Sequence, residues 1–389
     1  MSSTRDRSMQ LAPASVSDYR ELARRRLPRQ LFDYLEGGAY DERTMADNLG
    51  ALQQLQLRQR VLRDVSDIDL SVEVLGRRWS LPVALGPVGL LGMFARRGEV
   101  QAARAAAAAG VPFCESTVSI CSVEEVRQAT AGELWFQLYV MRDRGYAESL
   151  MERARAAGCE VLVLTVDLAV MGARYRDTRN GMTGSVPLSG RLARAWDLIS
   201  HLGWVGDVAL RGRPLTFGNL EDAVPGARSP AAFREWVDAQ FDPSVTWDDL
   251  AWVREHWPGQ VVLKGILDPE DAKLAAGIGA DAIVVSNHGG RQLDGVRATA
   301  DALPRVVDAV GDSVEVLVDG GVRSGLDVVK MLSLGARACL LGRAWGYAVA
   351  GGGEAGVAHV LQVIEQEMQV AMALTGHRTV GALGGDALE

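Results

Sequence analysis

The sequence predicts an α/β fold, a (β/α)8 TIM barrel, preceded by a helical segment and interrupted by a long insertion after its fourth strand. Two observations predict it. Short apolar runs alternate with alanine- and charge-rich stretches along most of the chain, and polar residues follow directly after the apolar runs. Repeated strand–helix units form parallel sheets, whose strands are buried on both faces and read as continuous apolar runs. Eight strands that close on themselves are the simplest arrangement, and an open doubly wound sheet is the alternative.

Eight apolar runs are the predicted strands. They are Leu81–Gly86, Pro112–Ser116, Leu134–Tyr139, Val161–Val166, Val261–Lys264, Ala282–Ser286, Val314–Val318 and Ala338–Leu341. Helical stretches follow most of them, namely Glu99–Ala109, Ser122–Ala129, Tyr146–Ala157, Pro269–Gly277, Ala300–Ala309 and Gly325–Leu334. Several of these helices are expected to end near a glycine, a residue common at helix C-termini. The glycines are Gly110, Gly158, Gly277 and Gly335.

Two segments lie outside this repeat. Residues 1–65 carry apolar residues at helical spacing and predict an N-terminal helical segment that packs on the barrel expected over residues 66–380. Residues 176–245, between the fourth and fifth strands, are too long for an ordinary loop. Long insertions on the C-terminal face of a barrel commonly serve as lids or binding elements, which is the role expected here.

Part of the insertion, residues 185–213, combines tryptophans with basic residues. These are Trp196, Trp204, Arg191, Arg194, Arg211 and Arg213. Aromatic and basic side chains together are typical of a segment that meets a membrane surface. A cover over the active site and simple packing on the barrel are the two alternatives.

The composition limits the class of protein. A chain of 389 residues, 48% of them hydrophobic, can bury a large core. Its net charge of −8 argues against nucleic-acid binding, which requires a basic surface. The N-terminal stretch lacks the apolar region of a secretory signal, and no uncharged apolar stretch is long enough to span a membrane. We expect a cytoplasmic protein whose membrane contact, where present, is peripheral on the inner face.

The candidate site lies at the C-terminal ends of the strands, because these ends meet on one face of a barrel. The residues at or just after the eight runs include Gly86, Pro87, Val88, Gly89, Ser116, Gln137, Tyr139, Thr165, Asp167, Lys264, Ser286, His288, Arg291, Asp319, Gly320, Gly321, Arg323, Gly342 and Arg343. Polar residues collected at one end of each strand are what an active-site face predicts. A purely structural barrel gains nothing from them.

The stretch SNHGGRQLDG after the sixth run is the most informative. The imidazole of His288 has an intrinsic pKa suited to accepting a proton near neutral pH. Arg291, three residues later, can clamp a carboxylate through two hydrogen bonds. The glycines between them let a ligand approach closely. The other four histidines lie in helix-like or terminal contexts, and a structural role for His288 is the alternative.

Three further charged residues complete the predicted chemistry. Asp167 would orient the ring of His288 and favour the imidazolium form, with a helix N-cap as the alternative. Arg174 would add a second positive charge, and two arginines facing one cavity imply an anionic substrate. Lys264 ends an apolar run, so its amine would stabilise negative charge on a reduced cofactor or, alternatively, reach solvent.

Two glycine-rich loops, DGGVRSG and LGR, predict a phosphate site after the seventh and eighth strands. Tight turns are the alternative explanation of their glycines. The stretch GGGEAG at Gly351–Gly356 matches a dinucleotide-binding pattern but follows a helix-like segment, so no such site is expected there. The four cysteines form no C-x-x-C pair, so we expect buried thiols and no metal site.

At this point the chain resembles the FMN-dependent enzymes that oxidise L-2-hydroxy acids, which include glycolate oxidase, L-lactate dehydrogenase, lactate oxidase and mandelate dehydrogenase. SNHGGRQLDG carries most of the resemblance, which covers about residues 15 to 376. The chain looks most similar to the bacterial respiratory L-lactate dehydrogenase branch. That likeness rests on GGAYDERT, GPVGLLGMFARRGEVQAARAA, STVSICSVEEV, WFQLYVMRDRG, GARYRD, KGILDPEDA and EQEMQVAMALTG.

The resemblance implies a role for each site residue. His288 would be the base, supported by Asp167, and Tyr139 would bond the substrate hydroxyl. Arg291, Arg174 and Tyr34 would hold the carboxylate, beside Gly89. The FMN would be lined by Pro87, Val88, Gly89, Ser116, Gln137, Thr165, Lys264, Ser286, Asp319, Gly320, Gly321, Arg323, Gly342 and Arg343. Abstraction of a carbon-bound proton and concerted hydride transfer need the same histidine, so both routes stay open.

Departures from the family pattern concern the substrate. Val88 replaces a frequent threonine and Gly89 a frequent alanine, and a smaller residue at position 89 is compatible with weaker oxygen use or a bulkier substrate. LAVMGARYRD lacks the prolines of the lactate enzymes and is closer to the mandelate enzyme. We expect an L-lactate-like substrate, with a mandelate-type or other bulky 2-hydroxy acid as the alternative.

The partners follow from the same resemblance. The electrons would pass to a quinone, to O2 or to another acceptor, and the chain would form a homo-oligomer, most simply a tetramer. A flavin-binding sensor without turnover is the alternative from another class of protein.

Overall fold

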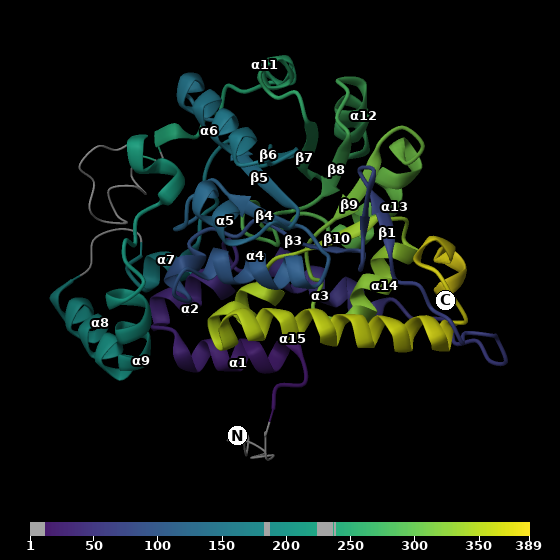
Figure 1. The fold of residues 1–389 in the computed structure, drawn as a ribbon, viewed down its shortest axis with the longest axis horizontal. Helices are drawn as coiled ribbons and strands as arrows, with labels where there is room; N and C mark the ends of the chain where they lie inside the picture. Colours follow the sequence, from purple (N-terminus) through teal and green to yellow (C-terminus); the bar gives the residue numbers. More distant parts are fainter. Residues whose placement is uncertain (1–11, 183–186, 224–235, 237–238) are drawn as a thin grey trace.

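The computed structural model describes residues 12–182, 187–223, 236 and 239–389. Its centre is a closed barrel of eight parallel strands in the order β10-β3-β4-β5-β6-β7-β8-β9 (Figure 1). The strands are β3 (Val83–Leu85), β4 (Phe113–Ser116), β5 (Leu134–Tyr139), β6 (Val161–Thr165), β7 (Gln260–Ile266), β8 (Ala282–Val285), β9 (Glu315–Val318) and β10 (Ala338–Leu341). The last strand pairs with the first, with Cys339 opposite Val83. The predicted barrel is confirmed, and the open-sheet alternative is wrong.

The strands form where both faces of the chain are buried. Every residue of β6 and β8 is buried, as is every residue of β10. Side chains that point inward fill the barrel, and those that point outward pack against the helices. Two-sided burial explains why continuous apolar runs predicted all eight strands.

The helices surround the barrel. They are α4 (Gly98–Ala108), α5 (Val123–Ala129), α6 (Arg144–Ala156), α11 (Asp249–His256), α12 (Pro269–Gly277), α13 (Thr299–Val310), α14 (Gly325–Ser333) and α15 (Arg343–Thr375). A left-handed backbone conformation occurs at three of the four glycines expected near helix C-termini, Gly110, Gly158 and Gly335. In the case of α12 it occurs at Gly279 rather than Gly277, which is the last helical residue.

Three helices precede the barrel: α1 (Val16–Arg26), α2 (Arg29–Glu36) and α3 (Arg43–Gln54). Helix α1 lies along α15 at the base of Figure 1. A two-stranded antiparallel hairpin of β1 (Val72–Val74) and β2 (Arg77–Trp79) follows, and none of the apolar runs predicted it. Its turn uses Leu75 and Gly76 at positive φ.

The glycine-rich stretch GGGEAG lies inside α15, which is kinked at Gly353. A Cβ atom on Gly352 would lie 3.1 Å from the ring of Tyr19 in α1, and one on Gly356 would lie 2.4 Å from a backbone oxygen of its own helix. These glycines therefore serve helix packing, consistent with the expectation that no dinucleotide binds there. All four cysteines are buried and unpaired.

The insertion between β6 and β7 contains α7 (Tyr175–Arg179), α8 (Leu188–Ser200), α9 (Leu202–Trp204), the π-helical turn η2 (Val205–Leu210) and the 3-10 helix η3 (Gly218–Ala223). Parts of it, residues 183–186, 224–235 and 237–238, lie outside the described residues, as do residues 1–11 of the predicted N-terminal segment. The two tryptophans of residues 185–213 differ. Trp204 is buried and donates to the carbonyl of Met93, whereas Trp196 is 73% exposed.

Candidate active site

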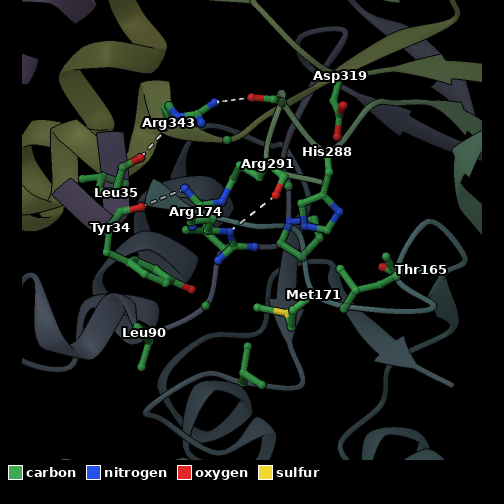
Figure 2. Close-up of a pocket in the computed structure, with 18 of the residues that line it drawn as sticks. Tyr34, Leu35, Leu90, Thr165, Met171, Arg174, His288, Arg291, Asp319 and Arg343 are labelled. Atoms are coloured by element: carbon green, nitrogen blue, oxygen red, sulfur yellow. Dashed lines mark hydrogen bonds between the residues drawn. The ribbon is translucent and has the colours of Figure 1, made fainter. Parts of the chain in front are cut away.

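A cavity of about 640 Å³ opens at the C-terminal ends of the strands. Most of the predicted site residues line it, and Figure 2 shows how several converge. The predicted residues in the wall are Tyr34, Pro87, Val88, Gly89, Tyr139, Thr165, Arg174, Lys264, His288, Arg291, Asp319, Gly320, Gly321, Arg323, Gly342 and Arg343. The predicted residues outside the wall are Ser116, Gln137, Asp167 and Ser286. These four touch residues that line the cavity or each other, through the hydrogen bonds described below.

His288 lines the cavity wall and pairs with Asp167 behind it, and their side chains are 18% and 14% exposed. Imidazole Nδ1 lies 3.0 Å from Oδ1 and 3.2 Å from Oδ2 of the carboxylate. His288 has a φ of 56°, in the left-handed region, and its backbone N–H donates to the hydroxyl of Ser286. Asp167 fits here because Gly265 has no side chain, since a Cβ there would lie 2.7 Å from the Asp167 Cβ.

The electrostatics of the pair leave a free base. Burial lowers the pKa of His288 below its ordinary value, although Asp167 opposes this shift. Burial alone would raise the pKa of Asp167, but His288 and Lys264 together hold it below its ordinary value. A neutral ring that donates from Nδ1 to an ionised carboxylate keeps the lone pair on Nε2 available to accept a proton.

Two arginines create a positive region next to this pair. Arg291 donates through Nη1 to the carbonyls of Tyr34 (2.8 Å) and Gly37 (2.7 Å), and its guanidinium lies 4.8 Å from the ring centre of Tyr34. Arg174 donates to the carbonyl of Arg291 (Figure 2). Burial is the main cause that lowers the pKa of Arg291 to about 9, and repulsion from Arg174 is the second. An anionic ligand would relieve this repulsion.

Lys264 is buried between two partners. Its ammonium lies 3.0 Å from the hydroxyl of Ser286 and 2.9 Å from a carboxylate oxygen of Asp319. Burial lowers its pKa, but Asp319 and Asp167 raise it above the ordinary value, so the lysine stays charged. This inward position differs from the solvent-exposed alternative considered above, since the side chain is only 6% exposed.

The two glycine-rich loops after β9 and β10 also reach the cavity. Gly320 and Gly321 both have positive φ, and a Cβ on Gly321 would lie 2.5 Å from the backbone oxygen of Asn48. The Arg343 guanidinium donates to the carbonyls of Leu35, Gly37 and Gly289. Burial lowers the pKa of Arg343 to about 10. Close backbone approach and buried arginines together suit a phosphate.

Several residues of the site were missed by sequence reasoning. The apolar part of the wall consists of Leu31, Leu35, Leu90, Met93, Val118, Leu168, Met171, Met182, Phe217, Phe241, Val322, Leu340 and Leu341. Gln30 and Arg194 meet at the wall, where Arg194 of α8 donates to the Gln30 side chain. Gln292 donates to the carbonyls of Asp167 and Val170 and so connects the histidine loop to the loop that follows β6. Apolar residues and amides like these carry no signal that separates them from ordinary core residues.

Comparison with known proteins decides the family. A family model described as FMN-dependent dehydrogenase matches residues 23–389. The chain belongs to the FMN-dependent dehydrogenase family. It is therefore a flavoprotein oxidoreductase whose cofactor is FMN, and the alternative of a sensor without turnover is not favoured.

Relatives within the family are similar over nearly the whole chain. An L-lactate dehydrogenase of Caulobacter vibrioides is 59% identical over 370 residues, which are 95% of this chain and 96% of that protein. One of Chromohalobacter salexigens is 54% identical over 375 residues, 96% of this chain and 95% of that protein. A crystal structure of the monotopic membrane protein (S)-mandelate dehydrogenase is 38% identical, with a TM-score of 0.91, and covers 98% of this chain and 100% of that one.

The residues present fit FMN. Gln137 accepts a hydrogen bond from Ser116 at Oε1, but its Nε2 is buried and has no partner among the described residues. This orphaned donor lies in the C-terminal half of β5, as Lys264 does in β7. Hydrogen-bond donors and a cation suit the electron-rich carbonyls and nitrogens of a flavin ring. The glycine-rich loops with their arginines suit its phosphate.

Proposed function

We propose that this FMN-dependent dehydrogenase oxidises a small L-2-hydroxy acid, L-lactate or a close analogue, to the 2-oxo acid. The observation that carries the proposal is the hydrogen bond between His288 and Asp167, next to two arginines that line the same cavity. A base beside a carboxylate-binding region is what oxidation of a 2-hydroxy acid requires. The names of the similar proteins, L-lactate dehydrogenases at 52 to 59% identity, support this substrate class.

His288 is the base in this proposal. Its ring is neutral at neutral pH because burial lowers the pKa, and Nε2 takes the substrate's proton. Asp167 holds the ring through Nδ1 and stabilises the imidazolium that forms. Removal of either the hydroxyl proton or the carbon-bound proton is compatible with this geometry.

The substrate is oriented by four side chains. Arg291 and Arg174 bind the carboxylate, and Tyr34, over which both guanidiniums lie, fixes their position. Tyr139 lines the cavity and bonds the substrate hydroxyl. Burial raises the pKa of Tyr139 well above its ordinary value, so the phenol stays protonated and can donate.

FMN supplies the electron acceptor for the two electrons that leave the hydroxy acid. Lys264, Ser116 and Gln137 would hold the polar edge of the ring, and the ammonium of Lys264 would stabilise added negative charge. The loops after β9 and β10 would hold the phosphate with Arg323 and Arg343. The remaining cofactor contacts would come from Pro87, Val88, Gly89, Thr165, Ser286, Asp319, Gly320, Gly321 and Gly342.

A bulkier side chain on the substrate is the second candidate. The apolar wall of the cavity includes Met93, Met171 and Phe241, and methionines adapt readily to ligands of different shape. A Cβ on Gly89 would lie 2.6 Å from a methyl carbon of Val118, so an alanine there would narrow this space. The structural similarity to mandelate enzymes supports this candidate.

The experiment is an anaerobic panel of hydroxy acids added to the yellow holoenzyme. L-Lactate is expected to bleach the flavin absorbance, with D-lactate as the control that should leave it unchanged. Faster bleaching by L-mandelate than by L-lactate would favour the second candidate. If no L-2-hydroxy acid bleaches the flavin, the proposal is wrong.

We also propose that the enzyme is a cytoplasmic protein that binds the membrane peripherally and passes electrons to a quinone. No helix among the described residues is long and apolar enough to cross a membrane. Helix α8 nevertheless has no buried residue, and it exposes Leu188, Leu192, Trp196 and Ile199. Arginines at 191, 194, 211 and 213 accompany this apolar stripe and suit anionic headgroups. A homo-tetramer is expected and would be tested by light scattering.

A further inference from the structure

One face of α3 is buried against the loop that follows β8. Thr44 and Asn48 lie about one helical turn apart on this face and are 0% and 2% exposed. The backbone N–H of Thr44 donates to the carboxylate of Asp294 at 2.7 Å. Its hydroxyl accepts from the backbone N–H groups of Gly295 (2.8 Å) and Val296 (3.2 Å). Helix α3 is therefore bonded to this loop rather than merely packed on it.

The side chain of Asn48 forms a reciprocal amide pair with Asn287. Each side-chain nitrogen donates to the other residue's oxygen, and both distances are 2.8 Å. Asn48 Oδ1 also accepts from the backbone N–H of Thr299 at 3.1 Å, and Asn287 donates to the carbonyl of Arg297 at 3.2 Å. Asn48 thus joins the beginning of the loop to its end.

This pair fixes the backbone on both sides of the proposed base. Asn287 directly precedes His288, and its side-chain oxygen accepts from the N–H of Gly290 at 3.2 Å. His288 lies between them with a φ of 56°. A side-chain-bearing residue keeps this strained conformation only where its surroundings fix it. The amide pair is one such constraint, and the hydroxyl of Ser286 is another.

The close approach of α3 is built into the loop glycines. A Cβ on Gly290 would lie 2.6 Å from the backbone nitrogen of Met45. Gly320 lies in the loop after β9. A Cβ on this residue would lie 2.8 Å from the Thr299 hydroxyl and 3.3 Å from Asn48 Nδ2. Asn48 of the N-terminal segment therefore reaches both loops, since it bonds to Asn287 in the histidine loop and lies next to Gly320 in the glycine-rich loop.

We propose that Asn48 is a positioning residue for the oxidation reaction, which acts through Asn287 to hold the imidazole of His288 at its working angle toward Asp167 and the substrate. The proposal rests on the proposed function, in which His288 is the base. It assigns the N-terminal helical segment a part in the chemistry, although Asn48 lies behind the cavity wall and touches no substrate.

Asn48→Ala and Asn287→Ala, singly and combined, test this. Each single variant is expected to lower the saturating rate of anaerobic flavin reduction by L-lactate about 100-fold, because small misplacement of a reacting group has effects of that order. The substrate dissociation constant should change much less, since the arginines are intact. The double variant should lose no more than either single variant, because both changes break one connection.

The matched control is Ser333→Ala, which removes another buried hydrogen bond, to the carbonyl of Val329 in α14. It should reduce flavin at the wild-type rate. Additive losses in the double variant, or a wild-type rate in Asn287→Ala, would overturn the proposal. Asn287→Ala gives this answer even where Asn48→Ala does not fold.

A second readout does not depend on turnover. The chain has five histidines, so histidine-labelled protein gives few ring signals in NMR, and His288→Ala assigns the one of interest. Loss of the amide pair should admit water and raise the pKa of His288 toward its ordinary value; Lys264, Arg174 and Asp167 all face the ring in either state. An unchanged titration contradicts the proposal. Failure of the wild-type enzyme to oxidise any hydroxy acid would instead contradict the proposed function.

Discussion

At the scale of single residues, the buried pair of His288 and Asp167 controls the pH dependence of the reaction. Burial lowers the pKa of His288 below 6.5, its ordinary value. Below that pKa the ring is protonated and cannot accept a proton, whereas above it the ring is a free base. The rate of flavin reduction should therefore rise with pH to a plateau, with its midpoint below pH 6.5. Stopped-flow reduction across pH 4.5 to 8 measures this, and a midpoint well above 6.5 would contradict it.

Replacing Asp167 with asparagine separates its two effects. The charge of Asp167 raises the pKa of His288 against the effect of burial, so its removal should lower the apparent pKa further. The plateau rate should fall about 100-fold or more, since the imidazolium loses its partner and the ring its orientation. Flavin content serves as the control for folding. An unshifted pH profile would mean that Asp167 does not act on His288.

Arg291→Lys tests the carboxylate site. Arg291 already uses one nitrogen to hold the carbonyls of Tyr34 and Gly37, so only a guanidinium can do this and bind a substrate as well. The dissociation constant for L-lactate should rise about tenfold or more, which is at least about 1.4 kcal/mol. The exposed Arg58→Lys is the matched control. Equal affinities in all three proteins would remove Arg291 from the substrate site.

At the scale of elements, α8 is the part of the chain whose exposed apolar face needs explanation. Leu192→Gln combined with Trp196→Gln removes two side chains that are 66% and 73% exposed. Cosedimentation with vesicles that contain anionic lipid should fall about tenfold or more, because both side chains would lose apolar contact with the lipid. Activity with a soluble acceptor should be unchanged, since neither residue lines the cavity.

The control for this experiment is Leu274→Gln in α12, which alters an exposed leucine on another side of the barrel. It should bind vesicles like the wild type. Equal vesicle binding by the α8 variant and the wild type would mean that α8 faces solvent or another protein.

The elements also show what a sequence can predict. All eight strands were predicted because two-sided burial leaves a continuous apolar run, as in Val161–Thr165. The hairpin of β1 and β2 was missed because its strands have only three residues each. Charged residues such as Glu73 and Arg78 also interrupt their apolar residues. Trp204 and Trp196 looked alike in the sequence, yet one packs on the barrel and the other is exposed, because only the tertiary fold decides which side of a segment is covered.

At the scale of the whole molecule, the barrel brings distant residues to one face. The polar strand-end residues of the site could be predicted, because parallel strands end at the same edge. The apolar wall and the link between Asn48 and Asn287 could not be predicted, because neither leaves a local pattern in the sequence. The two asparagines are 239 positions apart. The resemblance suggested Tyr34 for the site, and the structure places its ring beside both arginines.

The central claim is that this barrel oxidises an L-2-hydroxy acid with His288 as its base. The most direct measurement is stopped-flow, anaerobic reduction of the holoenzyme by L-lactate, for the wild type and for His288→Ala with its FMN content determined. The wild type should bleach rapidly, and the variant should stay yellow with FMN bound and reduce at least about 100-fold more slowly. A variant that carries FMN and reduces at the wild-type rate would contradict the claim.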